Sequence, residues 1–178
     1  MKLLQLSSLC AAMLFSATAA QANISTFSGV TDMIVNQTSY VEDGIVTTPL
    51  AGKIWGWPVA GQLHLDAEGY AGNSVDFTFT QGLFSLKSLD VSYSVPGAAG
   101  TLTAYGLSNE LLFSSVIGPS AGTLSFNGWN NISRLNLLNT SNHMSVDNLV
   151  LAPVPEPETY ALMGLGLVAL FAARRRQR

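Results

Sequence analysis

Two tryptophans separated by one glycine are the residues of this sequence best arranged for ligand binding. Trp55, Gly56 and Trp57 occupy one short stretch. Residues two apart in a strand project from the same face, so we expect the two rings side by side with space left by Gly56 between them. Such a pair can stack on the apolar face of a ring-shaped ligand such as a sugar. The alternative is that the rings fill the core, and Pro58 favours an edge strand or loop.

Asp147 is a candidate for a cation site because it interrupts an apolar alternation that includes Val146, Leu149 and Leu151. An isolated buried carboxylate is costly unless it is paired, hydrogen-bonded or bound to a cation. Calcium binds such hard oxygen donors, about six to eight of them. The acidic and amide residues that could complete a set are Glu42, Asp43, Asp66 and Asn73. The alternative is that Asp147 begins a turn or caps a loop together with Asn148.

The sequence offers little evidence for catalytic residues or for a metal site built from histidines. His64 and His143 are far apart and lack a spacing such as HxxxH, and His64 between Leu63 and Leu65 is predicted to face solvent. Residues 118–122 have the spacing GxSxG, but no helix is predicted after them, as a nucleophile elbow would require. We therefore predict no catalytic residues and no enzyme activity.

The elements that must position these residues are strands. Apolar and polar residues alternate with period two in several segments, and turn-forming residues separate these segments. The expected strands are 75–80, 84–93, 100–105, 122–126, 133–137 and 144–151, with further candidates at 27–30, 39–41 and 45–46. Short strands at this spacing predict an all-β fold, a single antiparallel β-sandwich.

The N-terminal 22 residues are typical of a secretory signal peptide. Lys2 precedes an apolar segment, and Ala20-Gln21-Ala22 fits a small-x-small cleavage site. We therefore expect a signal peptide at 1–22 and a mature domain at 23–152. The chain's single cysteine, Cys10, lies within the signal, so disulfides are not expected in the domain.

The domain at 23–152 is acidic. It contains three cations (Lys53, Lys87 and Arg134) and nine carboxylates, a net charge of −6. This balance excludes a footprint for nucleic acid and offers no attraction to anionic lipid.

The C-terminal tail, residues 153–178, combines a proline-rich break, an apolar run and a cationic end. Pro155, Glu156 and Pro157 precede an apolar run at 160–173, and Arg174, Arg175, Arg176 and Arg178 follow it. Fourteen residues in a helix span roughly 21 Å, and snorkelling arginines extend that reach toward a bilayer core of ~30 Å. We predict a transmembrane helix at 159–173 with its arginine end in the cytoplasm. The alternative is a buried helix of a soluble domain.

This tail resembles the PEP-CTERM sorting signal of Gram-negative bacteria. Its sorting residues would be Pro155, Glu156, Pro157, Arg174, Arg175 and Arg176. The resemblance implies recognition by exosortase, a membrane enzyme, and processing for export to the cell surface or matrix.

The domain resembles jelly-roll carbohydrate-binding modules in three short segments, Glu42–Gly44, Phe84–Asp90 and Met144–Leu151. That resemblance implies a jelly-roll-like sandwich and a structural calcium held by Glu42 and Asp147.

We therefore expect an exported, non-enzymatic surface or extracellular-matrix protein. Its expected partners are exosortase, membrane lipid at the C-terminal helix, and exopolysaccharide at Trp55 and Trp57. The alternatives are an extracellular enzyme acting on glycans and an uncut, membrane-anchored periplasmic domain.

Overall fold

The computed structural model describes residues 21–30, 34–35, 38–57, 61–66, 73–93, 100–118, 122–140, 144–154 and 157–175. The chain divides into two compact units. Residues 22–154 form the first, a β-sandwich. The helix α2 (Pro157–Arg175) belongs to the second.

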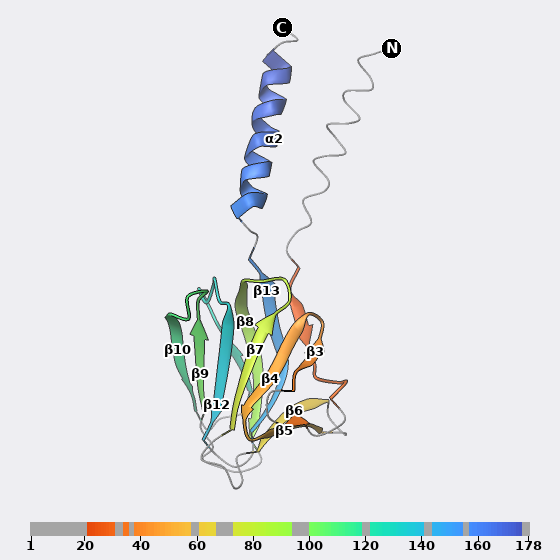
Figure 1. Ribbon diagram of the computed structural model, residues 1–178, viewed down its shortest axis with the longest axis vertical. Coiled ribbons are helices and arrows are strands. Elements are labelled where there is room, and N and C mark those ends of the chain that lie inside the picture. The colour runs from red at the N-terminus through yellow and green to blue at the C-terminus, as the bar shows by residue number, and fades with distance from the viewer. Residues whose placement is uncertain are drawn as a thin grey trace. The chain divides into compact units, whose positions relative to one another are not determined.

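Two antiparallel sheets make up the sandwich (Figure 1). The seven-stranded sheet contains, in spatial order, β11 (Gly122–Ser125), β8 (Phe84–Tyr93), β13 (Met144–Pro153), β6 (Gln62–Asp66), β5 (Lys53–Trp57) and β2 (Ile34–Val35), with β1 (Asn23–Ser25) also paired to β13. The six-stranded sheet contains β10 (Leu111–Ile117), β9 (Gly100–Tyr105), β12 (Arg134–Asn139), β7 (Asn73–Phe79), β4 (Ile45–Ala51) and β3 (Tyr40–Glu42).

Alternation along the strands builds the core between the sheets. In β7 and β9 every second residue is buried. The strand β12 pairs with both of them and aligns its own buried residues with theirs. Phe77, Leu102 and Leu135 from this sheet and Leu63, Leu89 and Val146 from the other are almost fully buried. Because the inward residues are apolar on both sheets, burial of the two inner faces stabilises the sandwich.

Most of the expected strands are observed with small shifts at their ends, but two expectations about strands need correction. Residues 27–30 are not a strand: Phe27 has a positive φ of 52°, and the Val30 amide donates to the Phe27 carbonyl in a turn. Both side chains are nevertheless buried in the core. Conversely, β10 was not expected, because the order of apolar and polar residues in Leu-Leu-Phe-Ser-Ser-Val-Ile does not have period two.

Candidate binding surfaces

The outer face of the seven-stranded sheet presents one continuous row of side chains across four strands. Trp55 of β5 lies opposite His64 of β6, which lies opposite Ser145 of β13, which lies opposite Ser92 of β8. The Trp55 and His64 rings are 4.7 Å apart between centroids, and His64 Nδ1 is 2.9 Å from Ser145 Oγ. We call these four residues the tryptophan row.

The prediction that His64 faces solvent is wrong. Its side chain does project from the outer face, since Leu63 and Leu65 fill the core, but it is only 3% exposed. Trp55 covers the imidazole from one neighbouring strand, and Ser145 engages it from the other. Burial of an outward residue depends on its cross-strand neighbours, which alternation along a single strand does not reveal.

Trp55 itself remains partly exposed, and the Lys53 ammonium lies 4.9 Å from the centre of its ring. Trp57 follows two residues later in β5, opposite Gln62, although its side chain lies outside the described residues. Gly56 does not leave space between the two rings, as the sequence had suggested. It faces the core side, where a Cβ atom would collide with the Val30 carbonyl, so the glycine permits close packing of two backbone segments.

Two carboxylates oppose each other on the same outer face. Asp147 of β13 is the register partner of Asp90 of β8, and Asn148 bonds to both. The Asn148 amide N–H donates to Asp147 Oδ1 at 2.7 Å, and its side-chain Nδ2 donates to Asp90 Oδ2 at 2.7 Å. Within the described part of the chain, no basic side chain forms a salt bridge with either carboxylate. We call Asp90 and Asp147 the aspartate pair.

A β-bulge explains why Asp147 interrupts the apolar alternation. The register between β13 and β8 shifts after Asp147, and Asn148 has a positive φ of 46°. The extra residue moves Leu149 and Leu151 back into the core, while Asp147 stays on the outer face. Burial raises the pKa of Asp147. The charges of Asp90 and Glu42 raise it further, against the lowering effect of the Asn148 bond.

Glu42 has a different environment, because four hydroxyl groups donate to its carboxylate. Its Oε2 accepts bonds from Ser25 and Tyr40, each at 3.0 Å, and Oε1 accepts bonds from Thr26 at 3.3 Å and Ser28 at 3.1 Å. Partial burial tends to raise the pKa of Glu42, but these donors outweigh it and the net effect is a lowered pKa. Burial, followed by the bond to Glu42, raises the pKa of Tyr40 to about 12.

These bonds give Glu42 a structural role that needs no metal: it ties the end of β1 and the segment after it to the edge strand β3. Among the described residues, no three acidic, histidine or cysteine side chains gather into a metal-binding set. Glu42 acts on Asp147 through its charge, but nothing places both on one ion. A calcium site with Glu42 and Asp147 as ligands stays a prediction.

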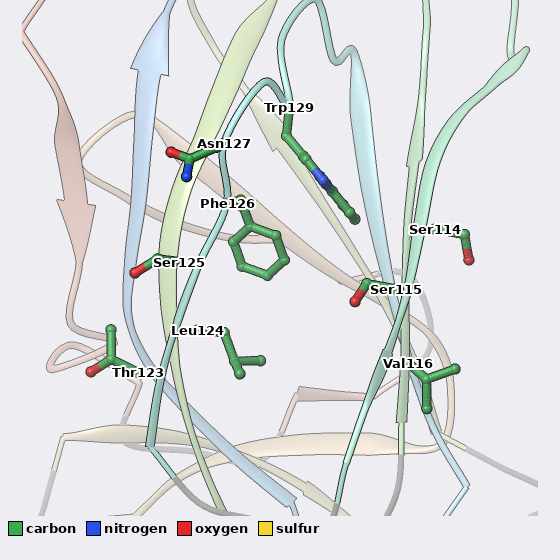
Figure 2. Close-up of a pocket in the computed structure, with 9 residues that line it drawn as sticks. All are labelled: Ser114, Ser115, Val116, Thr123, Leu124, Ser125, Phe126, Asn127 and Trp129. Atoms are coloured by element: carbon green, nitrogen blue, oxygen red, sulfur yellow. The ribbon is translucent and has the colours of Figure 1, made fainter.

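A groove of about 420 Å³ opens between β10 and β11, the edge strands of the two sheets. Figure 2 shows the side chains of Leu124, Phe126 and Trp129 turned toward the strand that carries Ser115. Trp129 stacks on Phe113 at 5.2 Å and contacts Phe126 at 4.8 Å between ring centroids. Sequence reasoning did not identify this groove, because β10 was not expected as a strand.

Residues 157–175 of the sorting tail are helical. The helix α2 extends over 19 residues, and Arg174 and Arg175 lie in its last turn, where cations complement the helix dipole. Among the helices that the structure describes, none is both long and apolar enough to cross a membrane. The transmembrane segment at 159–173 therefore stays a prediction. Pro155, Glu156, Arg176, Arg178 and His143 lie outside the described residues.

Comparison of the sequence with family models identifies the tail. Residues 153–176 match the model of the PEP-CTERM protein-sorting motif, a span that includes the six predicted sorting residues. No curated protein sequence matches the chain.

Comparison with solved structures identifies the architecture of the sandwich. One similar structure is a variant of the carbohydrate-binding module CBM29-2, at 17% identity and a TM-score of 0.50, over 75% of this chain and 93% of that chain. A second is another CBM29-2 variant complexed with mannohexaose, at 16% identity and a TM-score of 0.50, over 76% and 93%. A third is a DUF4465 family protein from Bacteroides caccae, at 10% identity and a TM-score of 0.53, over 74% and 98%. The predicted all-β, jelly-roll-like sandwich is confirmed.

Proposed function

We propose that this protein is an exported, non-enzymatic surface or extracellular-matrix protein whose sandwich binds polysaccharide. The observation that carries the proposal is the combination of a sorting motif at 153–176 with a sandwich similar to carbohydrate-binding modules. An exosortase-type enzyme would recognise the tail at the inner membrane, where α2 would contact lipid. The delivered domain would then meet polysaccharide outside the cell.

The outer face of the seven-stranded sheet is the surface that fits this role. The tryptophan row supplies a partly exposed indole held by His64, and the aspartate pair supplies acceptors for sugar hydroxyls. A sugar ring binds such a surface by stacking its apolar face on the indole while its hydroxyls bond to the polar groups beside it. Holding Trp55 between Lys53 and His64 limits the conformational entropy lost on binding.

Calorimetric titration with mannohexaose and with cellulohexaose tests the binding face. These are the ligands named for two similar CBM29-2 structures. We expect Trp55→Ala to weaken binding by about tenfold or more, equivalent to 1.4 kcal/mol. Tyr105→Ala on the six-stranded sheet is the matched aromatic control and should bind as the wild type does. Equal affinity of the wild type and Trp55→Ala would exclude this face.

The sorting step has its own test. Replacing Pro155, Glu156 and Pro157 with alanine should leave the full-length protein in the membrane fraction, and intact mass should show a C-terminus at Arg178. The wild-type protein should appear outside the cell with a shortened tail. A wild-type protein that stays uncut in the membrane would support an anchored periplasmic domain instead.

A further inference from the structure

The sheet edges of the sandwich are not equally protected against pairing with another chain. Among the described strands, β1, β2, β3 and β11 are edge strands of three, two, three and four residues. The remaining described edge strand, β10, has seven residues. Short edge strands are one means by which proteins avoid unwanted pairing, since few backbone groups are left without partners. Among these five edges, β10 alone lacks this protection.

The composition of β10 also favours pairing. It contains no charged residue and no proline, the two residue types that most often protect an edge. Val116 and Leu111 are 75% and 62% exposed, so the strand presents two large apolar side chains to solvent. A bulge between Leu111 and Phe113 interrupts the pairing with β9, so the regular part of the strand is Phe113–Ile117.

The groove between β10 and β11 is a second feature that would help this edge to accept a strand from another chain. Ser115 points into it from β10, toward Leu124 and Phe126 (Figure 2). A strand that pairs with the free edge would direct alternate side chains into this layer. Strand addition derives its affinity from main-chain hydrogen bonds and its specificity from such recesses for alternate side chains.

We propose that β10 pairs antiparallel with β10 of a second copy of this protein, with Ser115 opposite Ser115. In this register Phe113 lies opposite Ile117 on the inner side and Ser114 lies opposite Val116 on the outer side. The two Val116 side chains become diagonal neighbours, which covers the most exposed apolar group of the strand. The phenyl ring of Phe113 from the second copy extends the apolar layer formed by Leu124 and Phe126.

Charge favours a second copy at this edge over other surfaces of the domain. Two copies of the domain at 23–152, each with a net charge of −6, repel one another over most of their surfaces. The segment Leu111–Ile117 is uncharged, so the two-fold pairing brings no like charges opposite each other. The β3 edge, by contrast, carries Glu42 and is followed by Asp43.

Cysteine cross-linking of the full-length protein tests the pairing and its register together. Cys10 is the only cysteine, so Ser115→Cys in a Cys10→Ser background carries a single thiol. Directly opposite residues in an antiparallel pair have Cα atoms about 4.5–5.5 Å apart, within the range that a disulfide spans. We expect a mild oxidant to convert this variant to a covalent dimer, visible on a non-reducing gel.

Val41→Cys is the matched control, because Val41 is 56% exposed on β3, the opposite edge of the same sheet. It should remain monomeric under the same oxidant. Adding Val116→Lys to the Ser115→Cys variant should reduce cross-linking by about tenfold or more, because two ammonium groups would then be diagonal neighbours. Val116→Glu should act in the same way, with the opposite charge.

Three results would overturn the proposal: a Ser115→Cys variant that stays monomeric, equal cross-linking of Ser115→Cys and Val41→Cys, or cross-linking that neither charge at position 116 reduces. Unfolding midpoints measured by tryptophan fluorescence would establish that each variant is folded. These outcomes are independent of glycan affinity, so the pairing and the proposed polysaccharide binding can fail separately.

Discussion

The outer faces of the two sheets each carry a partly buried aspartate, in opposite electrostatic settings. On the six-stranded sheet, Asp76 accepts bonds from Arg134 at 3.2 Å and Asn136 at 2.6 Å, and Arg134 also lies over the Tyr105 ring. On the seven-stranded sheet, Asp147 faces a second carboxylate, Asp90, and its pKa is raised. Asp76 is neutralised by a side chain of its own face, whereas no salt bridge among the described residues neutralises Asp147.

This contrast separates structural from functional carboxylates. Glu42 resembles Asp76 in that the protein supplies its hydrogen-bond donors, and these donors lower the pKa of Glu42. The aspartate pair lies beside the tryptophan row, and a perturbed carboxylate at a candidate site is evidence for a functional surface. The outer face of the seven-stranded sheet is therefore the better candidate for ligand contact.

Removing the cation of the neutralised face should have the largest effect. We expect Arg134→Ala to lower the free energy of unfolding by about 1–3 kcal/mol, because Asp76 is only 13% exposed and would lose its ion pair. Urea unfolding at pH 7, followed by fluorescence, measures this loss. The control is Lys87→Ala, an exposed cation on β8, which should change stability by less than about 0.5 kcal/mol.

Glu42→Gln should have the next largest effect and lower the free energy of unfolding by about 1–2 kcal/mol, since the amide is a weaker acceptor for the hydroxyl donors. The loss should depend on pH. The folded pKa of Glu42 is lowered, so its contribution is present above the ordinary value of 4.5 and is lost as the pH falls through the folded pKa. Unfolding curves of the wild type and Glu42→Gln should therefore converge in acid. Asp43→Asn, at the adjacent turn residue, is the control, and a loss independent of pH would contradict the assignment.

Asp147→Asn should produce a smaller effect of the opposite sign. The folded pKa of Asp147 is raised, so ionisation of this residue reduces stability as the pH rises through that value. At pH 7 the amide should increase stability by about 0.5 kcal/mol, because it removes repulsion from Asp90. Asp76→Asn should instead decrease stability, and equal losses in both variants would remove the distinction between the two faces.

Calcium should produce the smallest effect. If Asp147 takes part in a calcium site, the ion stabilises the wild-type protein by on the order of 0.4 kcal/mol when its concentration equals Kd. Thermal unfolding with and without EDTA should show this shift, and Asp147→Asn should remove it. A wild-type Tm that does not respond to either calcium or EDTA would leave the aspartate pair without a metal.

Several structural features could be predicted because they depend on residues close together in the chain. The strands 84–93 and 100–105 are observed with the expected bounds, since period-two alternation records which side of a strand is buried. The sorting motif could likewise be recognised from contiguous residues, and a family model matches it. Trp55 and Trp57 could be placed on one strand for the same reason.

The strand-rich sandwich, the acidic charge of the domain and the sorting motif follow from the order of the residues alone. Four further features depend on the folded structure: His64 is covered, Asp147 faces Asp90, Glu42 accepts bonds from four hydroxyls, and β10 is an unprotected edge. Each of these depends on residues far apart in sequence that sheet pairing brings together. Alternation specifies which way a side chain points, but the register of the neighbouring strands specifies what it meets.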